Sequence, residues 1–385
     1  MLQKINQFGI YLITFSLPFY LVRFKIGWVP TNLLELLIIG LFVIWLVQKY
    51  KLLTSDVDNF SFYPIFPIFL IFFGVTISTL FSSNLEISAG IWKSWFVIPL
   101  LFLFILINEL KTKEQIRNVL ITLFLSGIGV SLIALSYWFD NNLTYDGRLR
   151  AFYLSPNYLA MYLSPILILS FYLYFLVQKK ALKFLLILGY LLLSFVIYLT
   201  YSYGAWLGLL GALFFLIFKQ RRFRIISVFL LLFVLFFIIQ IPGQKFQSLL
   251  DFSYPSLESR IMIWQSAWEI IKDHPLNGIG PGMFQKYYLY YQARSYLEWA
   301  VPQPHNLFLA FWLQTGLIGL IGFIWLLKDF FKKIRFKQVF SSILIGVMIY
   351  ILIHGLIDTP YWKNDLAVLF WLIIALSYKS DYLFD

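Results

Sequence analysis

Long apolar runs divide almost the whole chain, and they constrain its fold more than any other feature of the sequence. The chain is 61% hydrophobic and only 12% charged, far more apolar than a soluble domain requires. About 20 apolar residues in a helix cross a bilayer, and backbone groups in lipid must be satisfied within their own segment. We therefore predict an all-α membrane protein, a single polytopic domain over residues 1–385, with about twelve spans: 7–24, 31–48, 62–81, 89–107, 117–139, 156–177, 182–200, 204–218, 223–241, 305–327, 338–357 and 364–378.

The first apolar run, residues 7–24, has the length of either a signal peptide or a retained span. It lacks a strong basic segment before it and a small-residue cleavage site after it. We therefore expect it to be retained. The sequence contains no cysteine, so neither a disulfide nor a thiolate nucleophile is expected.

The net charge of +12 comes from basic residues that lie in short clusters between the apolar runs. Such a charge could suggest a nucleic-acid partner, but this distribution is typical of membrane orientation. With the N-terminus in the cytoplasm, every second connection is basic. We predict a protein of the cytoplasmic (inner) membrane with both termini cytoplasmic and no nucleic-acid partner. The predicted inner clusters are Lys49 and Lys51; Lys111, Lys113 and Arg117; Lys179, Lys180 and Lys183; residues 219–224; and residues 328–337.

One long polar stretch, residues 256–309, interrupts the apolar runs, and the charge pattern places it outside the cell membrane. It makes up most of an extracytoplasmic loop over 242–304, which is too short for an independent enzyme domain. A helix is predicted from about Ser256 to the residue before His274-Pro275, because a residue preceding proline is disfavoured in the α region. One face of this helix is apolar and aromatic with a cation at its start, so we expect it to lie on the membrane surface. That face contains Arg260, Trp264, Ala267, Trp268 and Ile271.

A glycine-rich bend follows this helix at Gly278-Ile279-Gly280-Pro281-Gly282. Closely spaced glycines let backbone N–H groups approach an anion, which makes Gly280 and Gly282 candidate substrate-binding residues. The alternative is that they only turn the chain. The aromatic residues between 284 and 304 also have two interpretations, because Tyr and Trp serve both as anchors at the membrane interface and as platforms for sugar rings.

His305 stands where the chain re-enters the membrane, with Asn306 directly after it. One interpretation is an interfacial histidine that caps a helix. The other is a general base that works near neutral pH at the lipid–water boundary. His354 and Asp358 lie one helical turn apart and are candidates to orient His305 from a second shell. The alternative for them is an isolated interfacial pair.

Two arginines, Arg148 and Arg150, lie just before the predicted span at 156–177. An arginine near lipid usually has an anionic partner. Here the candidates are Asp140, Asp146, a lipid headgroup and a substrate phosphate.

Several of these segments together resemble the O-antigen ligase and O-antigen polymerase-like membrane proteins. The resemblance covers residues 147–310, about half of the chain. It also includes the long outer loop after the ninth predicted span. It rests on Arg148/Arg150 with Pro156-Asn157-x-x-Ala160, on Thr200-x-Ser202-x-Gly204, on Arg260-x-x-x-Trp264-x-x-Ala267, on Pro275-x-x-Gly278-Ile279-Gly280-Pro281-Gly282-x-Phe284, and on His305-Asn306-x-x-Leu309. One position departs from the family pattern, because Tyr203 stands where the family usually has an arginine.

The resemblance implies a GT-C-like helix bundle and a metal-independent glycosyltransferase without a cofactor. The donor would be a glycan on a polyprenyl diphosphate such as undecaprenyl diphosphate, and the acceptor a hydroxyl of a glycan, a lipid-linked saccharide or a protein. Arg260 would neutralise the departing diphosphate and His305 would take or orient the acceptor proton. Arg148, Arg150, Asn306, Gly280, Gly282 and the Tyr203 position would contact the substrate.

Two other functions stay open at this stage. Twelve spans also suit a solute transporter, for example of bicarbonate, but a carrier should place charges at mid-membrane, and the predicted spans are nearly free of them there. Tyr203 in place of arginine would also fit an inactive scaffold of a glycan-assembly complex. The sequence does not distinguish a ligase from a polymerase or a protein glycosyltransferase, because these differ only in the acceptor.

Overall fold

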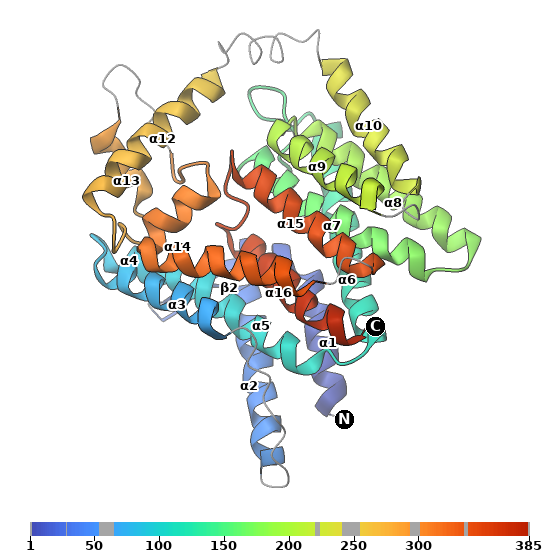
Figure 1. Cartoon of the computed structure of the whole chain (residues 1–385). Coiled ribbons are helices and arrows are strands. Elements are labelled where there is room, and N and C mark those ends of the chain that lie inside the picture. The colour runs from blue at the N-terminus through green and yellow to red at the C-terminus, as the bar shows by residue number, and fades with distance from the viewer. Residues whose placement is uncertain are drawn as a thin grey trace.

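A computed structural model describes residues 2–27, 29–53, 65–219, 224–240, 255–292, 301–334 and 338–383 (Figure 1). Within these residues every predicted span coincides with at least one helix. Two parts of the predicted 242–304 loop, residues 242–254 and 293–300, lie outside the described residues. The helices are α1 (Leu2–Phe15), η1 (Leu17–Leu21), α2 (Leu33–Leu53), α3 (Ile65–Leu80), α4 (Leu85–Trp92), η2 (Lys93–Val97), α5 (Ile98–Glu109), α6 (Lys113–Phe139), α7 (Pro156–Leu176), α8 (Lys180–Leu199), α9 (Tyr203–Lys219), α10 (Arg224–Gln240), α12 (Pro255–Asp273), α13 (Phe284–Tyr291), α14 (Leu307–Lys333), α15 (Val339–Gly355) and α16 (Asn364–Leu383).

The protein is a mostly helical, multi-pass membrane protein. In the described part of the chain, 5 helical segments are long and apolar enough to cross a membrane, namely Leu85–Glu109, Lys113–Phe139, Pro156–Leu176, Lys180–Leu199 and Leu307–Lys333. Further apolar helices of 10–17 residues include Tyr203–Lys219 and Val339–Gly355. The total of twelve spans stays a prediction.

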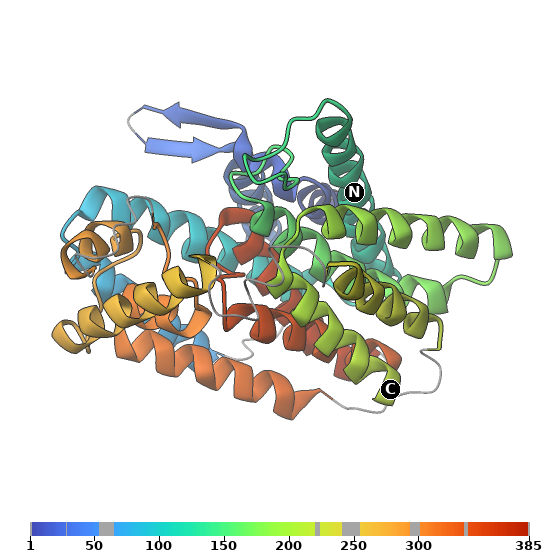
Figure 2. The same cartoon turned by 90° about the horizontal axis from the view of Figure 1, so that it is seen from above.

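A small β-hairpin corrects the prediction that the chain is entirely helical. Strand β1 (Arg23–Ile26) pairs antiparallel with β2 (Val29–Asn32), and the hairpin projects from the bundle in Figure 2. The predicted span at 7–24 is accordingly shorter, because α1 ends at Phe15 and a 3₁₀ helix follows. Pro18 has no backbone N–H, so it cannot continue the hydrogen-bonding pattern of α1.

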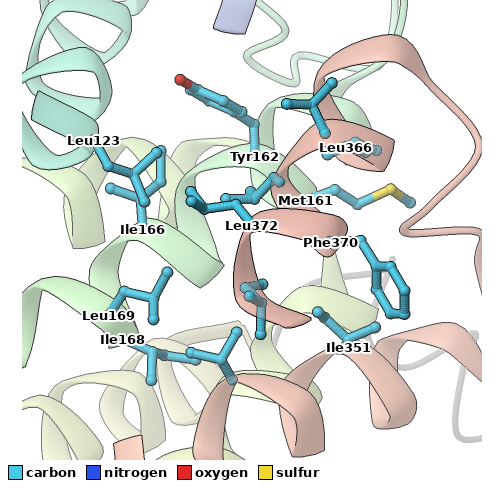
Figure 3. Packing of buried hydrophobic residues seen from close by; sticks show 14 of the residues in the cluster. Leu123, Met161, Tyr162, Ile166, Ile168, Leu169, Ile351, Leu366, Phe370 and Leu372 are labelled. Carbon is cyan, nitrogen blue, oxygen red and sulfur yellow. The ribbon is translucent and has the colours of Figure 1, made fainter. Parts of the chain in front are cut away.

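Helix α7 is the centre of the bundle. Nearly all of its side chains are buried, which is what a helix that is apolar all round requires. Figure 3 shows Leu123 of α6, Ile166 and Leu169 of α7, Ile351 of α15 and Phe370 of α16 packed together. The N-terminal end of α7, at Pro156-Asn157, faces the candidate site described below.

Helices α3 and α14 cross with their backbones almost in contact. A methyl group on Gly74 would lie 2.5 Å from the backbone nitrogen of Gly319 and 2.7 Å from the carbonyl oxygen of Thr315. Small residues at such crossings allow close helix packing where lipid supplies no hydrophobic driving force.

We expect Gly74→Ala to lower the stability of the protein by on the order of 1–3 kcal/mol, because backbone atoms cannot move aside as a flexible side chain can. The thermal unfolding midpoint in detergent measures this. The matched control is Gly129→Ala, where an added methyl group meets nothing within 4 Å, and it should leave the midpoint unchanged or raise it. Equal midpoints for both variants would contradict the close α3–α14 crossing.

Helix α14 is broken at Gly316, and the break receives the bend that follows α12. Gly316 has φ 68° and ψ −179°, a conformation that glycine adopts without steric cost. The bend uses the backbone groups that the break exposes: Leu317 N–H donates to the carbonyl oxygen of Leu276 (3.0 Å), and Ile279 N–H donates to that of Leu313 (2.7 Å). The polar stretch is thereby fixed to the helix that follows His305.

Candidate functional site

His305 lies in the turn that enters α14, and its backbone has a left-handed φ of 46°. Asn306 is the N-cap of α14: its Oδ1 accepts from the N–H groups of Phe308 and Leu309, both at 3.0 Å. The Nδ2 of Asn306 donates to the carbonyl oxygen of Leu356 (2.9 Å). Asn306 therefore joins the His305 turn to the end of α15, and both Oδ1 and Nδ2 of its side chain make hydrogen bonds within the protein.

The imidazole of His305 contacts the carboxylate of Asp358. Nδ1 of His305 lies 3.1 Å from Oδ1 of Asp358, and the histidine side chain is 33% exposed whereas the carboxylate is 4% exposed. Burial by itself would raise the pKa of Asp358, but the charge and hydrogen bond of His305 and the charge of Arg260 outweigh it and hold the pKa below its usual range. An ionised carboxylate only accepts, so Nδ1 carries the hydrogen, and in the neutral form of the ring Nε2 is then an acceptor.

A chain of hydrogen bonds holds Asp358 from its other side. Asn157 Nδ2 donates to Oδ2 of Asp358 (2.7 Å), and Arg148 Nη2 donates to Oδ1 of Asn157 (2.6 Å). Arg148 Nε also donates to the carbonyl oxygen of Thr200 (2.8 Å). The guanidinium of Arg148 is thus hydrogen-bonded within the protein, and it orients Asp358 through Asn157. Its contact with substrate stays a prediction.

Arg150, two residues further along the same connection, is placed differently. It is half-buried, and within the described residues its Nε makes no hydrogen bond and its guanidinium forms no ion pair. A buried guanidinium N–H without an acceptor is costly. Of the two arginines, Arg150 is therefore the one with capacity left for an anionic ligand.

Arg260 lies on α12, close enough to the His305–Asp358 pair for its charge to lower the pKa of Asp358. It is half-buried and has no ion-pair partner among the residues that the structure describes. Helix α12 is positioned by Trp264, whose Nε1 donates to the carbonyl oxygen of His305 (3.3 Å). The helix that carries Arg260 is thereby joined to the turn that carries His305.

Helix α12 has the predicted limits, ending at Asp273 just before His274-Pro275. Of the predicted apolar face, Ala267 and Ile271 are buried and Trp268 is 47% exposed, and Ile263 and Ile270 are buried as well. These residues pack with α13 and the bend in a small separate cluster. The stretch therefore has its own core, and the position of α12 on a membrane surface stays a prediction.

His354 does not touch His305. Its Nδ1 lies 2.9 Å from the hydroxyl of Tyr350, one turn earlier on α15, and its carbonyl oxygen accepts from the Asp358 N–H (2.9 Å). Only Asp358 of this predicted second-shell pair contacts the His305 ring. His354 acts on Asp358 through the backbone.

Gly280 and Gly282 pack against neighbouring helices. Gly282 N–H donates to Oε1 of Gln314 (3.0 Å), and the Pro281 carbonyl oxygen accepts from Ser88 Oγ (2.8 Å). A methyl group on Gly280 would lie 2.6 Å from Cβ of Ser82. These contacts fix the bend against α3, α4 and α14, and a contact of either glycine with substrate stays a prediction.

Tyr203 is the first residue of α9, and its ring stacks edge-on against Trp206 with centroids 5.2 Å apart. The next residue, Gly204, lies directly against His354: an added methyl group would be 2.9 Å from Cδ2 of that ring. The Tyr203 position therefore lies beside the turn that carries His354.

Two residues of this network were not among the predicted site residues, Asn157 and Tyr350. Asn157 had a signal in the Pro156-Asn157 motif, which placed an amide at the start of a helix. Tyr350 lies four residues before His354, which places both on one face of α15. Within the described residues, no three His, Asp or Glu side chains gather in a group that could hold a metal ion.

Comparison with known proteins supports the family resemblance. Residues 188–324 match the family model described as O-antigen ligase. No curated protein matches the chain. The matched region includes Tyr203, Arg260 and His305, whereas Arg148, Arg150 and Asp358 lie outside it. The match confirms the resemblance to O-antigen ligases over residues 188–324, which is less than half of the chain.

Proposed function

We propose that this O-antigen ligase-like membrane protein transfers a glycan from a polyprenyl-diphosphate carrier to an acceptor hydroxyl. The observation that carries the proposal is the His305–Asp358 pair, in which a buried carboxylate holds Nδ1 of a partly exposed imidazole at 3.1 Å. This arrangement leaves Nε2 of His305 to accept a proton, and two half-buried arginines lie on the elements around it.

In the proposed reaction the acceptor oxygen forms a bond to C1 of the first donor sugar. The bond between C1 and the diphosphate oxygen breaks, and its electron pair leaves with the diphosphate, which stays on the polyprenyl carrier. The acceptor proton passes to Nε2 of His305, and Asp358 stabilises the resulting imidazolium. Arg260 and Arg150 hold the diphosphate and neutralise the charge that develops on it, a role that suits guanidinium groups.

The arginine that the family usually has at the Tyr203 position is replaced in this proposal by Arg150. Arg148 does not serve, because its guanidinium already donates to Asn157 and Thr200. Arg150 has a buried Nε without an acceptor in the described part of the chain. A second cation is therefore available for the diphosphate, which favours an active enzyme over an inactive scaffold.

The orientation belongs to the same proposal. We place the protein in the cytoplasmic membrane with both termini inside, so that the site and the 242–304 loop face the extracytoplasmic side. This follows from the basic residues in alternate connections. The donor glycan would then be presented on the outer face, with its polyprenyl tail in the bilayer.

The proposal is tested by comparing cells with and without the gene. We expect mass analysis of surface glycans to show that one glycan species is lost, while its polyprenyl-diphosphate-linked precursor accumulates. Re-expression of the full-length protein should restore the species. Unchanged glycans together with protein-dependent uptake of a labelled solute into vesicles would favour a transporter and contradict the proposal.

A further inference from the structure

A groove lies at the end of the bundle opposite the His305 site. It has a volume of about 730 Å³ and is formed by the first half of α6, the last turn of α7, the α7–α8 connection and the first half of α8. Helix α7 begins at the site with Asn157 and reaches the groove with Leu173 and Leu176. Its 21 residues span about 30 Å, so the groove and the site lie at opposite ends of a helix that is long enough to cross a membrane.

The wall of the groove is apolar along its length. Leucines of α8 that point outward line it, among them Leu182, Leu185 and Leu188, which are 45–59% exposed. Gly189 lines the groove where α8 packs on α6: a methyl group there would lie 3.0 Å from Cδ1 of Ile128. This space between α6, the end of α7 and α8 is the slot that we expect a flexible hydrocarbon chain to fill.

The mouth of the groove is polar and basic. Arg117, Gln178 and Lys179 line it, and Lys180 and Lys183 follow within one turn. Among the described residues, the acidic group that pairs with these cations is Glu114, whose Oε1 lies 3.1 Å from Nη2 of Arg117. That pair is 46% and 71% exposed, so it is weak, and the other guanidinium N–H groups stay available.

We propose that this groove binds one anionic glycerophospholipid, with an acyl chain in the slot and the phosphate between Arg117 and Lys179. Basic pockets between membrane helices at the cytoplasmic side suit such headgroups. In the orientation proposed above, this is the inner leaflet.

The positive charge at the mouth favours an anionic lipid over two alternative occupants, a second copy of the chain and the polyprenyl tail of the donor. A second copy of the chain would bring an equally basic mouth against this one. If the tail of the polyprenyl donor filled the groove, the cations at the mouth would have no anionic partner. In the proposed reaction its diphosphate binds at the other face of the membrane.

The test uses the full-length protein in detergent and native mass spectrometry, with phosphatidylglycerol and phosphatidylcholine of the same acyl chains as probes. We expect the wild-type protein to bind one phosphatidylglycerol about tenfold more tightly than phosphatidylcholine. The double variant Arg117→Gln/Lys179→Gln should lose this preference. The matched control, Lys328→Gln/Lys332→Gln, removes two exposed cations from α14 and should keep it.

A third variant, Leu185→Trp, fills the slot without changing the mouth, and it should weaken both lipids. Equal binding of the two lipids to the wild type, an unchanged preference in the Arg117/Lys179 variant, or a dimer that Leu185→Trp dissociates would each overturn the proposal. Because lipid binding is read directly, these outcomes are independent of whether the protein transfers glycans.

Discussion

Replacing His305 by alanine is expected to lower the rate of glycan transfer by roughly 10²–10⁴-fold, the range that general acid–base catalysis contributes. The physical reason is that no other described group takes the acceptor proton beside Asp358. The measurement is transfer from a polyprenyl-diphosphate-linked glycan in proteoliposomes, normalised to the amount of folded protein. His305 is partly exposed, so the variant should reach the membrane in normal amounts.

Asp358→Asn belongs to the same experiment, because the amide keeps the shape of the carboxylate and removes its charge. The imidazolium then loses its stabilising partner, and we expect a loss of similar order. Asp140→Asn is the matched control, since Asp140 is exposed at the end of α6, and it should transfer normally. Full transfer by both the His305 and the Asp358 variant would exclude this pair from the reaction.

The pH dependence separates catalysis from unfolding in this experiment. The pKa of Asp358 is lower in the folded protein than its usual value, so its ionisation contributes stability above the unfolded-state pKa of about 4. That contribution is lost only as the pH falls through the lower folded-state value. A decrease of wild-type transfer between neutral pH and about pH 5 therefore does not come from titration of Asp358.

Replacing Arg260 by alanine is expected to weaken use of the lipid-diphosphate donor by about 10–100-fold, since a hydrogen bond to a charged group contributes about 1.5–3 kcal/mol. Arg260→Lys should recover part of this, because lysine keeps the charge but not the bidentate geometry. The measurement is kcat/KM as the donor concentration is varied.

Lys272→Ala on the same helix is the control for Arg260. Lys272 pairs with Glu269 at 2.7 Å, and both side chains are 55% exposed, so its removal should change donor use by less than about twofold. If the Arg260 and Lys272 variants used the donor equally well, the diphosphate would not bind at α12.

The local elements of this fold were predictable because each has a local cause. The apolar runs predicted the helices, and His274-Pro275 predicted the end of α12. The hairpin at 23–32 was missed, because a short strand pair between two apolar runs has no periodicity that separates it from a span. The burial of Ile263 and Ile270 was also missed, since the helix α13 against which they pack was not expected.

The contacts within the site were less predictable, because they join residues far apart in sequence. His305 and Asp358 were both candidates, but their direct contact depends on how the turn before α14 meets the turn after α15. Arg148 donates hydrogen bonds to Asn157 and to the Thr200 carbonyl oxygen, and Arg150 does not. The spacing of the two arginines in the sequence does not show which of them has these partners. The packing of Gly280 and Gly282 against Ser82 and Gln314 of α14 was likewise not predictable, because it joins segments far apart in the chain.

The break at Gly316 has a mechanical consequence. Trp264 joins α12 to His305, and Trp312 Nε1 donates to the Pro275 carbonyl oxygen (2.8 Å), so α12, the bend and the first turns of α14 are linked as one unit. The longer part of α14, beyond Gly316, is held to the same unit, because Leu317 N–H donates to the Leu276 carbonyl oxygen (3.0 Å) and Gly319 packs against Gly74 of α3. The positions of Arg260 and His305 are therefore set by contacts within the protein, and we expect a thinner or thicker bilayer to leave their spacing unchanged.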